Sequence, residues 1–224
     1  KRDMPVNILA TLLLLLFLIN GTLERWEGII LLLGMVAYLV VVVRSALKKR
    51  KEHAAETGEE KEEDGEKVRP IPVILAFIVG GLLAIIWGGD LVVDNAQRIA
   101  LSFGMSPMLV GLTIVAMGTS LPELVTSIVA SRKGESGLAL GNAVGSCLFN
   151  ILFILGMSSV LSPIRLTGNG GIEAITDTAI LAGVSIVMLI CSATGKRVSR
   201  IEGVIYITIY LAYMAFAILR CYVF

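Results

Sequence analysis

The sequence predicts an all-α protein that crosses a lipid bilayer several times. Hydrophobic residues make up 56% of the chain but aromatic residues only 6%, so the excess consists of Leu, Ile, Val, Ala and Gly, which is typical of membrane helices. A spanning helix needs roughly 20 mostly apolar residues, and such runs recur along the whole chain. We predict seven spans, at about residues 5–20, 27–46, 71–93, 106–130, 138–161, 174–194 and 202–222.

Charge and cysteine usage exclude several classes of protein. The formal net charge is +1 and no basic stripe follows a predicted helix, so we expect no nucleic-acid partner. Cys147, Cys191 and Cys221 lie in or beside apolar runs, and their spacing fits neither a zinc site nor a disulfide framework. The first apolar run is long enough to span and lacks a small-residue cleavage site, so we do not expect a cleaved signal peptide.

A hydrophilic segment separates the second span from the third. Residues 47–70 begin with basic residues and continue with acidic ones, a composition that favours a solvated flexible linker over a folded or calcium-sensing insert. Counted at alternate ends of the spans, most Lys and Arg residues fall on the side of this linker. The linker is therefore predicted to be cytoplasmic and the C-terminus external.

The chain also repeats itself at an offset of 175 residues, from Glu24 to Ser199. Glu24-Arg25-Trp26-Glu27-Gly28 matches Ser199-Arg200-Ile201-Glu202-Gly203, and an Ala-Tyr pair follows each segment at the same distance. Internal repeats of this kind are typical of secondary transporters.

The offset pairs the first two spans with the last two, which predicts a repeat unit of five helices. An odd number of spans places two such units in opposite orientations, so we expect a 5+5 inverted repeat. Residues 1–46 are then the last two helices of the first unit, and residues 71–224 are the complete second unit. The other three helices of the first unit would precede Lys1, and a chain that opens on Lys rather than Met also suggests a longer protein.

One polar segment inside a predicted span surrounds Glu123. A carboxylate within a membrane helix is costly, so it needs a partner, a cavity or an ion. Pro122 lacks an amide hydrogen, which bends the helix and frees the carbonyl of Gly118. Helical spacing places other residues on the side of Glu123, namely Ala116, Thr119 and Ser120.

A second polar segment forms a stripe at intervals of four residues, Asn142, Ser146 and Asn150. Polar residues of this kind alone would be interpreted as contacts between helices. Together with Glu123, they offer carboxylate, hydroxyl, amide and carbonyl oxygens, which are hard ligands suited to Ca²⁺ or Na⁺. We therefore favour ion binding, with close helix approach at Gly118, Gly141 and Gly145.

The two segments resemble the alpha-repeat of the sodium/calcium exchanger family, within the calcium/cation antiporter superfamily. G-T-S-L-P-E-L at 118–124 and G-N-x-x-G-S-x-x-x-N at 141–150 match this motif in order and spacing. The resemblance implies ten helices in two inverted halves, each with one alpha-repeat; the one in this chain lies within residues 106–161. The implied activity is exchange of Na⁺ for Ca²⁺ by a multi-pass protein of the plasma membrane, without a cofactor.

The resemblance also implies a set of ion ligands, which is Glu123, Asn150, Thr119, Ser120, Ser146 and Ala116. Glu123 matches the carboxylate that binds Ca²⁺ and Na⁺, and Ala116 matches a carbonyl ligand. Asn150 stands where family members have Asn or Asp, and Asn supplies one negative charge fewer. Cys147 stands where Asn is common, and we assign it no function.

Other interpretations remain open at this point. A carboxylate such as Glu123 would also serve an exchanger that couples cations to protons. A seven-span receptor would match the span count, although it needs neither the internal repeat nor the intramembrane carboxylate. An enzyme is not expected, because His53, the single histidine, lies in the linker and no H-E-x-x-H motif is present.

Overall fold

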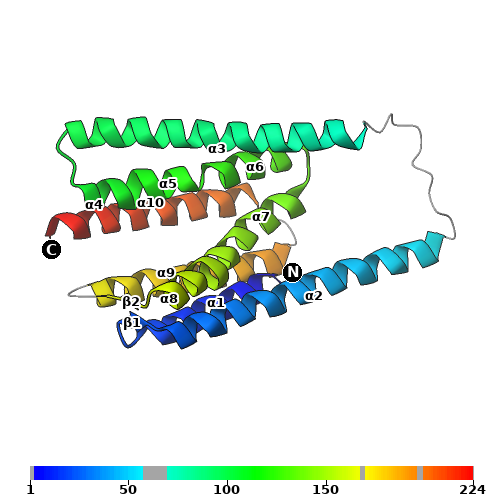
Figure 1. Ribbon diagram of the computed structural model, residues 1–224, viewed down its shortest axis with the longest axis horizontal. Coiled ribbons are helices and arrows are strands. Elements are labelled where there is room, and N and C mark those ends of the chain that lie inside the picture. Colours follow the sequence, from blue (N-terminus) through cyan, green and yellow to red (C-terminus); the bar gives the residue numbers. More distant parts are fainter. Residues whose placement is uncertain (1–2, 58–69, 167–169, 196–198, 224) are drawn as a thin grey trace. The chain divides into compact units, whose positions relative to one another are not determined.

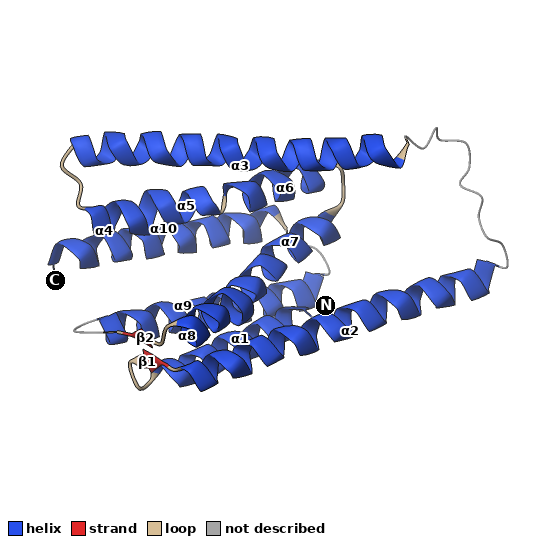
Figure 2. Cartoon of the chain, viewed as in Figure 1, coloured by secondary structure: helices blue, strands red, loops and turns tan. Residues whose placement is uncertain are grey.

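The computed structural model describes residues 3–57, 70–166, 170–195 and 199–223. Most of these residues are helical, as Figure 2 shows. The chain divides into two compact units, one formed by residues 1–65 and 140–196 and the other by residues 66–139 and 197–224.

The first unit is built from two early helices and two later membrane segments (Figure 1). Apolar side chains from these elements form its core, where Leu31 and Leu148 are fully buried. The span that contains Leu148 changes locally into a π-helical turn, η2, and then returns to α-helix. The elements are α1 (Asp3–Leu18), α2 (Arg25–Thr57), α7 (Ser136–Phe149), η2 (Asn150–Leu155), α8 (Gly156–Leu161) and α9 (Gly170–Gly195).

A short antiparallel strand pair ties two loops of this unit together. β1 (Thr22–Leu23) pairs with β2 (Ile164–Arg165), and the Leu166 amide donates to the Gly21 carbonyl over 2.9 Å. Gly21 has a φ of 67°, a left-handed conformation that suits glycine. The turn between α1 and α2 is thereby fixed to the turn between α8 and α9.

Helices α2 and α8 pack with their backbones in contact. A Cβ atom at Gly28 would stand 2.6 Å from the Gly156 carbonyl oxygen and would overlap the hydroxyl of Ser159. A Cβ atom at Gly156 would in turn stand 3.1 Å from the Gly28 carbonyl. Small residues allow this close approach. Within a bilayer the hydrophobic effect does not drive helices together, so van der Waals packing at such close contacts stabilises their association instead.

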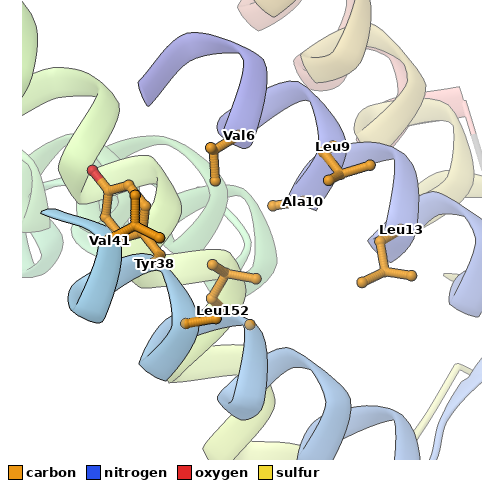
Figure 3. Close-up of a pocket in the computed structure, with 9 residues that line it drawn as sticks. Val6, Leu9, Ala10, Leu13, Tyr38, Val41 and Leu152 are labelled. Carbon is orange, nitrogen blue, oxygen red and sulfur yellow. The ribbon is translucent and has the colours of Figure 1, made fainter. Parts of the chain in front are cut away.

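On another side of α2, an apolar groove of about 300 Å³ separates it from α1 (Figure 3). Val6 and Leu13 line it from α1, Val41 from α2 and Leu152 from η2. The hydroxyl of Tyr38, another lining residue, donates to Asp3 Oδ1 over 3.1 Å. This hydrogen bond joins α1 and α2 beside the groove.

The second unit contains two long helices and one interrupted segment. Gly118 of this segment is buried, and a Cβ atom there would overlap the Val93 side chain, so the predicted close approach at Gly118 is confirmed. At Gly141 and Gly145 of the first unit, a Cβ would meet no described atom within 4 Å beyond the adjoining backbone of its own helix. The elements are α3 (Ile71–Ser102), α4 (Pro107–Val110), the π-helical turn η1 (Gly111–Val115), α5 (Ala116–Thr119), α6 (Leu121–Arg132) and α10 (Arg200–Val223).

Most of the predicted spans are long and apolar enough to cross a membrane. Five segments of the described chain meet this condition, and the bent pair Thr113–Thr119 and Leu121–Arg132 makes a sixth if it counts as one span. The first predicted span forms α1, whose 16 residues are fewer than the roughly 20 that a crossing needs. The five are Arg25–Lys48, Pro72–Ser102, Ser136–Leu161, Gly170–Cys191 and Arg200–Arg220.

The predicted linker at 47–70 begins as helix, because α2 continues to Thr57. The expectation of flexible chain from residue 47 is therefore wrong for this first part. Lys, Glu and Ala are good helix formers, and Lys48 and Glu52 form an i, i+4 ion pair at 3.6 Å. Residues 58–69 of the predicted linker lie outside the described residues.

The contact between α2 and α8 predicts that Gly28→Ala destabilises the protein. The added methyl group meets the Gly156 carbonyl and the Ser159 hydroxyl, and overpacking of this kind costs about 1–3 kcal/mol. We expect a melting temperature in detergent several degrees lower than that of the unaltered protein, measured by size-exclusion chromatography of heated samples.

Gly34→Ala on the same helix is the matched control, because its Cβ would lie in ordinary contact, 3.5 Å from Leu152 Cδ2. Alanine has the higher helix propensity, so this variant should melt at the same temperature as the unaltered protein or higher. An equal loss in both variants would contradict the close contact at Gly28.

Candidate functional site

The segment that carries Glu123 is broken at Ser120. The helical parts on either side differ in direction by 48°, and Ser120 itself has φ −94° and ψ 1°, outside α-helical values. The predicted bend is thus confirmed, and it lies two residues before Pro122. Pro122 occupies the first turn of α6, where a missing amide hydrogen costs no intrahelical bond.

The break redirects the hydrogen bonds around the Ala116 carbonyl. The Ser120 amide donates to the Met117 carbonyl over 3.2 Å rather than to Ala116 four residues back. The Ala116 carbonyl instead accepts the hydroxyls of Thr119 at 3.1 Å and Ser120 at 3.3 Å. Because hydroxyl groups can rotate and offer lone pairs as well as a proton, all three oxygens are suitable cation ligands.

Glu123 follows in the first turn of α6 and is half-buried. The N-terminal end of a helix carries partial positive charge, which favours a carboxylate there. Ala116, Thr119 and Ser120 are exposed within the described chain, whereas Gly118 is buried against Val93. The segment therefore packs through one side and leaves its polar side open.

The second polar stripe lies on α7 and η2 of the first unit. Asn142 and Ser146 are half-buried and Asn150 is exposed. Asn150 is the first residue of the π-helical turn η2. Ala116 also lies next to a π-helical turn, because it directly follows the last residue of η1. Single π-helical turns are rare and frequently occur at functional sites, so both segments depart from regular helix beside predicted ligands.

The predicted ligands fall into two groups that belong to different units. Ala116, Thr119, Ser120 and Glu123 lie around the break in the second unit, where the hydroxyls of Thr119 and Ser120 contact the Ala116 carbonyl, while Ser146 and Asn150 belong to the first unit. Within the described residues, no group of three or more His, Cys, Asp or Glu side chains is placed to hold a metal ion. A cation bound by either group would depend largely on neutral oxygens.

The sequence motifs do not predict a further buried polar cluster in the first unit. Asn7 and Thr11 of α1 and Ser185 of α9 are all more than nine-tenths buried, and Asn7 Nδ2 donates to Ser185 Oγ over 3.2 Å. A polar amide within the apolar run of the first predicted span is the only signal by which the sequence could have indicated it.

Comparison with known proteins identifies relatives along most of the chain. A family model described as sodium/calcium exchanger protein matches residues 73–219. The chain is 38% identical over 221 residues to a putative antiporter, CaxA, of Alkalimonas amylolytica, a match that covers 95% of this chain and 66% of the relative. It is 33% identical over 211 residues to the inner membrane protein YrbG of Escherichia coli K12, covering 92% and 62%.

Two further matches carry the word exchanger in their names. The sodium/calcium exchanger MaX1 of Methanosarcina acetivorans is 35% identical over 131 residues, covering 58% of this chain and 37% of the relative. A solved structure of the sodium-calcium exchanger NCX_Mj, soaked with 10 mM Na⁺ and no Ca²⁺, superposes with a TM-score of 0.72 at 26% identity, covering 96% of this chain and 65% of that one.

The chain therefore spans somewhat less than two thirds of the length of the first two relatives and of the matched structure. The family model matches well over half of the chain, and the match includes both polar motifs. The resemblance that these motifs carry is confirmed, and the chain belongs to the sodium/calcium exchanger family.

Proposed function

We propose that this chain forms part of a secondary-active antiporter that exchanges Na⁺ for Ca²⁺ across a membrane by alternating access. The observation that carries the proposal is the break at Ser120, where two hydroxyls contact a backbone carbonyl and a carboxylate follows in the first turn of the next helix, within a segment apolar enough to span a membrane. Irregular backbone at membrane depth is tolerated only where it is buried in protein or lines a cavity. An ion pathway accounts for both the break and the carboxylate.

The proposed ligands differ in charge: one is a carboxylate and the others are neutral oxygens. Glu123 supplies the negative charge that offsets part of the cation charge, and it is the group for which Na⁺ and Ca²⁺ compete. Ala116, Thr119 and Ser120 supply neutral oxygens around the break. The stripe on α7 and η2 supplies neutral oxygens from Ser146 and Asn150.

A complete Ca²⁺ site needs more than this set. Ca²⁺ usually takes 6–8 oxygen ligands, and a divalent ion beside one carboxylate retains an unbalanced charge, which is costly in a medium of low dielectric constant. We propose that a second alpha-repeat, outside these 224 residues, supplies the second carboxylate. The protein would then contain ten helices in two inverted halves.

Matching helix N-termini support the repeat on which this proposal depends. Glu27 Oε2 accepts the Glu24 amide over 2.7 Å at the start of α2, and Glu202 Oε2 accepts the Ser199 amide over 2.6 Å at the start of α10. The same glutamate-to-amide hydrogen bond therefore caps both helix starts, at the positions that the offset of 175 residues pairs. At α10 the cap is reciprocal, because the Glu202 amide also donates to Ser199 Oγ over 3.2 Å. Both glutamates therefore act as caps at the starts of their helices.

The first prediction from this site is that Glu123→Gln abolishes cation exchange. The substitution keeps the size of the side chain and removes its charge, so neither ion retains its charged ligand. Ca²⁺ uptake would be measured in vesicles that contain the full-length protein, with an outward Na⁺ gradient in one arm and a pH gradient in the other. We expect uptake by the unaltered protein in the Na⁺ arm and loss of at least about 100-fold in the variant.

Glu135→Gln is the control, since Glu135 is an exposed carboxylate between α6 and α7 of the same unit, and its loss should leave uptake unchanged. Normal uptake by the Glu123→Gln variant would overturn the ligand assignment. Uptake in the pH arm alone would replace Na⁺ by protons as the coupling ion.

The second prediction concerns orientation. The excess of Lys and Arg on the linker side of the spans predicts that residues 47–70 face the cytoplasm of a cell whose plasma membrane holds the protein. A cysteine introduced by Thr57→Cys, in a background in which Cys147, Cys191 and Cys221 are replaced by Ser, should react with a membrane-impermeant maleimide only from the cytoplasmic side. Reaction in intact cells would reverse the proposed topology.

The third prediction is that residues 1–224 alone do not exchange Na⁺ for Ca²⁺. One reason is that the proposed half-site contains a single carboxylate. A second reason is that alternating access requires two units that move against each other. The measurement is reconstitution of this chain in Na⁺-loaded vesicles, with its intact mass determined on the same sample. Robust exchange by a monomer of that mass would show that no second alpha-repeat is needed.

A further inference from the structure

Val93 of α3 packs directly onto the backbone of Gly118 in the broken segment. Gly118 is buried and Val93 is half-buried, and both residues belong to the second unit. Apart from the adjoining backbone of its own helix, the three atoms nearest to the place of a Cβ at Gly118 all belong to Val93. Val93 Cγ2 would overlap this Cβ, while Val93 Cβ would stand 3.2 Å and Cγ1 3.4 Å from it. One side chain of α3 therefore occupies the space that a side chain at Gly118 would need.

The backbone of Gly118 does not itself require glycine. Gly118 lies within α5, and the described glycines with a positive φ are Gly21, Gly104 and Gly134. Within a helix, glycine is less favourable than alanine. The close contact with Val93 is therefore the feature that explains a glycine at this position.

Along the chain, Gly118 lies among the proposed ligands of the second unit. Ala116, whose carbonyl accepts two hydroxyls, precedes it by two residues, and Thr119 and Ser120, which donate those hydroxyls, follow it directly. Glu123 comes next, in the first turn after the break. A displacement of Gly118 would therefore move these oxygens with it.

The helix that carries Gly118 is interrupted at both ends. α5 contains four residues, with the π-helical turn η1 before it and the break at Ser120 after it. Helices bend at irregular turns of this kind, so packing against another helix must fix the position of α5. Valine suits this purpose, because its branched side chain has one strongly preferred rotamer in a helix.

We propose that Val93 is a positioning residue for the ion site and acts through Gly118. Its side chain sets how closely α5 approaches α3, and it thereby sets where the oxygens of Ala116, Thr119 and Ser120 stand. The inference rests on the proposed function of these residues as ligands. It makes the sizes of residues 93 and 118 interdependent, which a general stabilising role for either residue does not.

The test exchanges volume between the two positions in the full-length protein, reconstituted in vesicles. Gly118→Ala adds a methyl group that overlaps Val93, so α5 must shift, and the half-saturating concentrations of Na⁺ and Ca²⁺ should rise by about 10-fold or more. Val93→Ala removes the support of α5 and should raise both by about 3- to 5-fold.

The double variant should behave better than either single variant. Once Cγ1 and Cγ2 of Val93 are gone, the methyl group at position 118 meets only the Cβ at position 93, at 3.2 Å, and a shift of a few tenths of an ångström relieves this contact. We expect both half-saturating concentrations to return to within about 2-fold of those of the unaltered protein, because residues in contact show coupled effects. Additive losses would overturn the inference.

Val92→Ala is the matched control on α3. Val92 is the neighbouring residue and is 60% exposed, so the same truncation there should leave both half-saturating concentrations unchanged. An equal shift in Val92→Ala and Val93→Ala would overturn the inference. So would a lower melting temperature in Gly118→Ala and Val93→Ala with unchanged half-saturating concentrations, because the contact would then only stabilise the fold.

The remaining outcomes separate this inference from the proposed function. If Glu123→Gln abolishes uptake but Val93→Ala does not compensate for Gly118→Ala, the inference fails and the proposed function stands. If Gly118→Ala alone does not fold, the double variant decides: recovery of folding and of near-normal half-saturating concentrations supports the inference, and their absence overturns it. If the unaltered protein shows no gradient-driven Ca²⁺ uptake, the proposed function itself fails and the inference fails with it.

Discussion

The absence of water in the bilayer core is the constraint on which this structure depends. Every backbone amide and carbonyl there must be paired within the protein, so spanning segments are driven towards unbroken α-helix. The chain follows this rule along α2, α3, α9 and α10. It departs from it at η1, at Ser120 and at η2. These departures lie beside Ala116 and Asn150, so irregular backbone and candidate ligands coincide.

Irregular segments need firm support on their other sides, and glycines allow it. In the first unit, η2 runs directly into α8, whose Gly156 touches the backbone of α2 at Gly28. In the second unit, Gly118 stands within the segment next to the break and packs against Val93 of α3. Each irregular stretch is thus adjacent to a contact that tolerates no side chain. The position of an exposed ligand can be maintained in this way although little covers the ligand itself.

Much of the fold could be predicted from the sequence because bilayer thickness sets the length of each span. The predicted span 27–46 corresponds to Arg25–Lys48, and 138–161 to Ser136–Leu161. Glu123 and Pro122 could be recognised because each is chemically out of place in an apolar run.

The π-helical turn at Gly111–Val115 has no comparable signal in its composition. The bridge from Asn7 to Ser185 joins residues 178 positions apart, so only the folded chain reveals it. The continuation of α2 to Thr57 was obscured because charged residues can extend a helix beyond the membrane as well as end it.

Charge balance explains how a site of this composition would couple two ions. One carboxylate neutralises one Na⁺, but it leaves Ca²⁺ with a net positive charge, and the other oxygens of the proposed set are neutral. Two cations about 4 Å apart repel each other by roughly 4 kcal/mol per pair of unit charges at an effective dielectric constant of 20. Na⁺ and Ca²⁺ would therefore not occupy Glu123 together, and binding of one ion would favour release of the other. Exchange requires this competition at a shared carboxylate, and the second carboxylate proposed for the other alpha-repeat would supply the charge that Ca²⁺ lacks in this half-site.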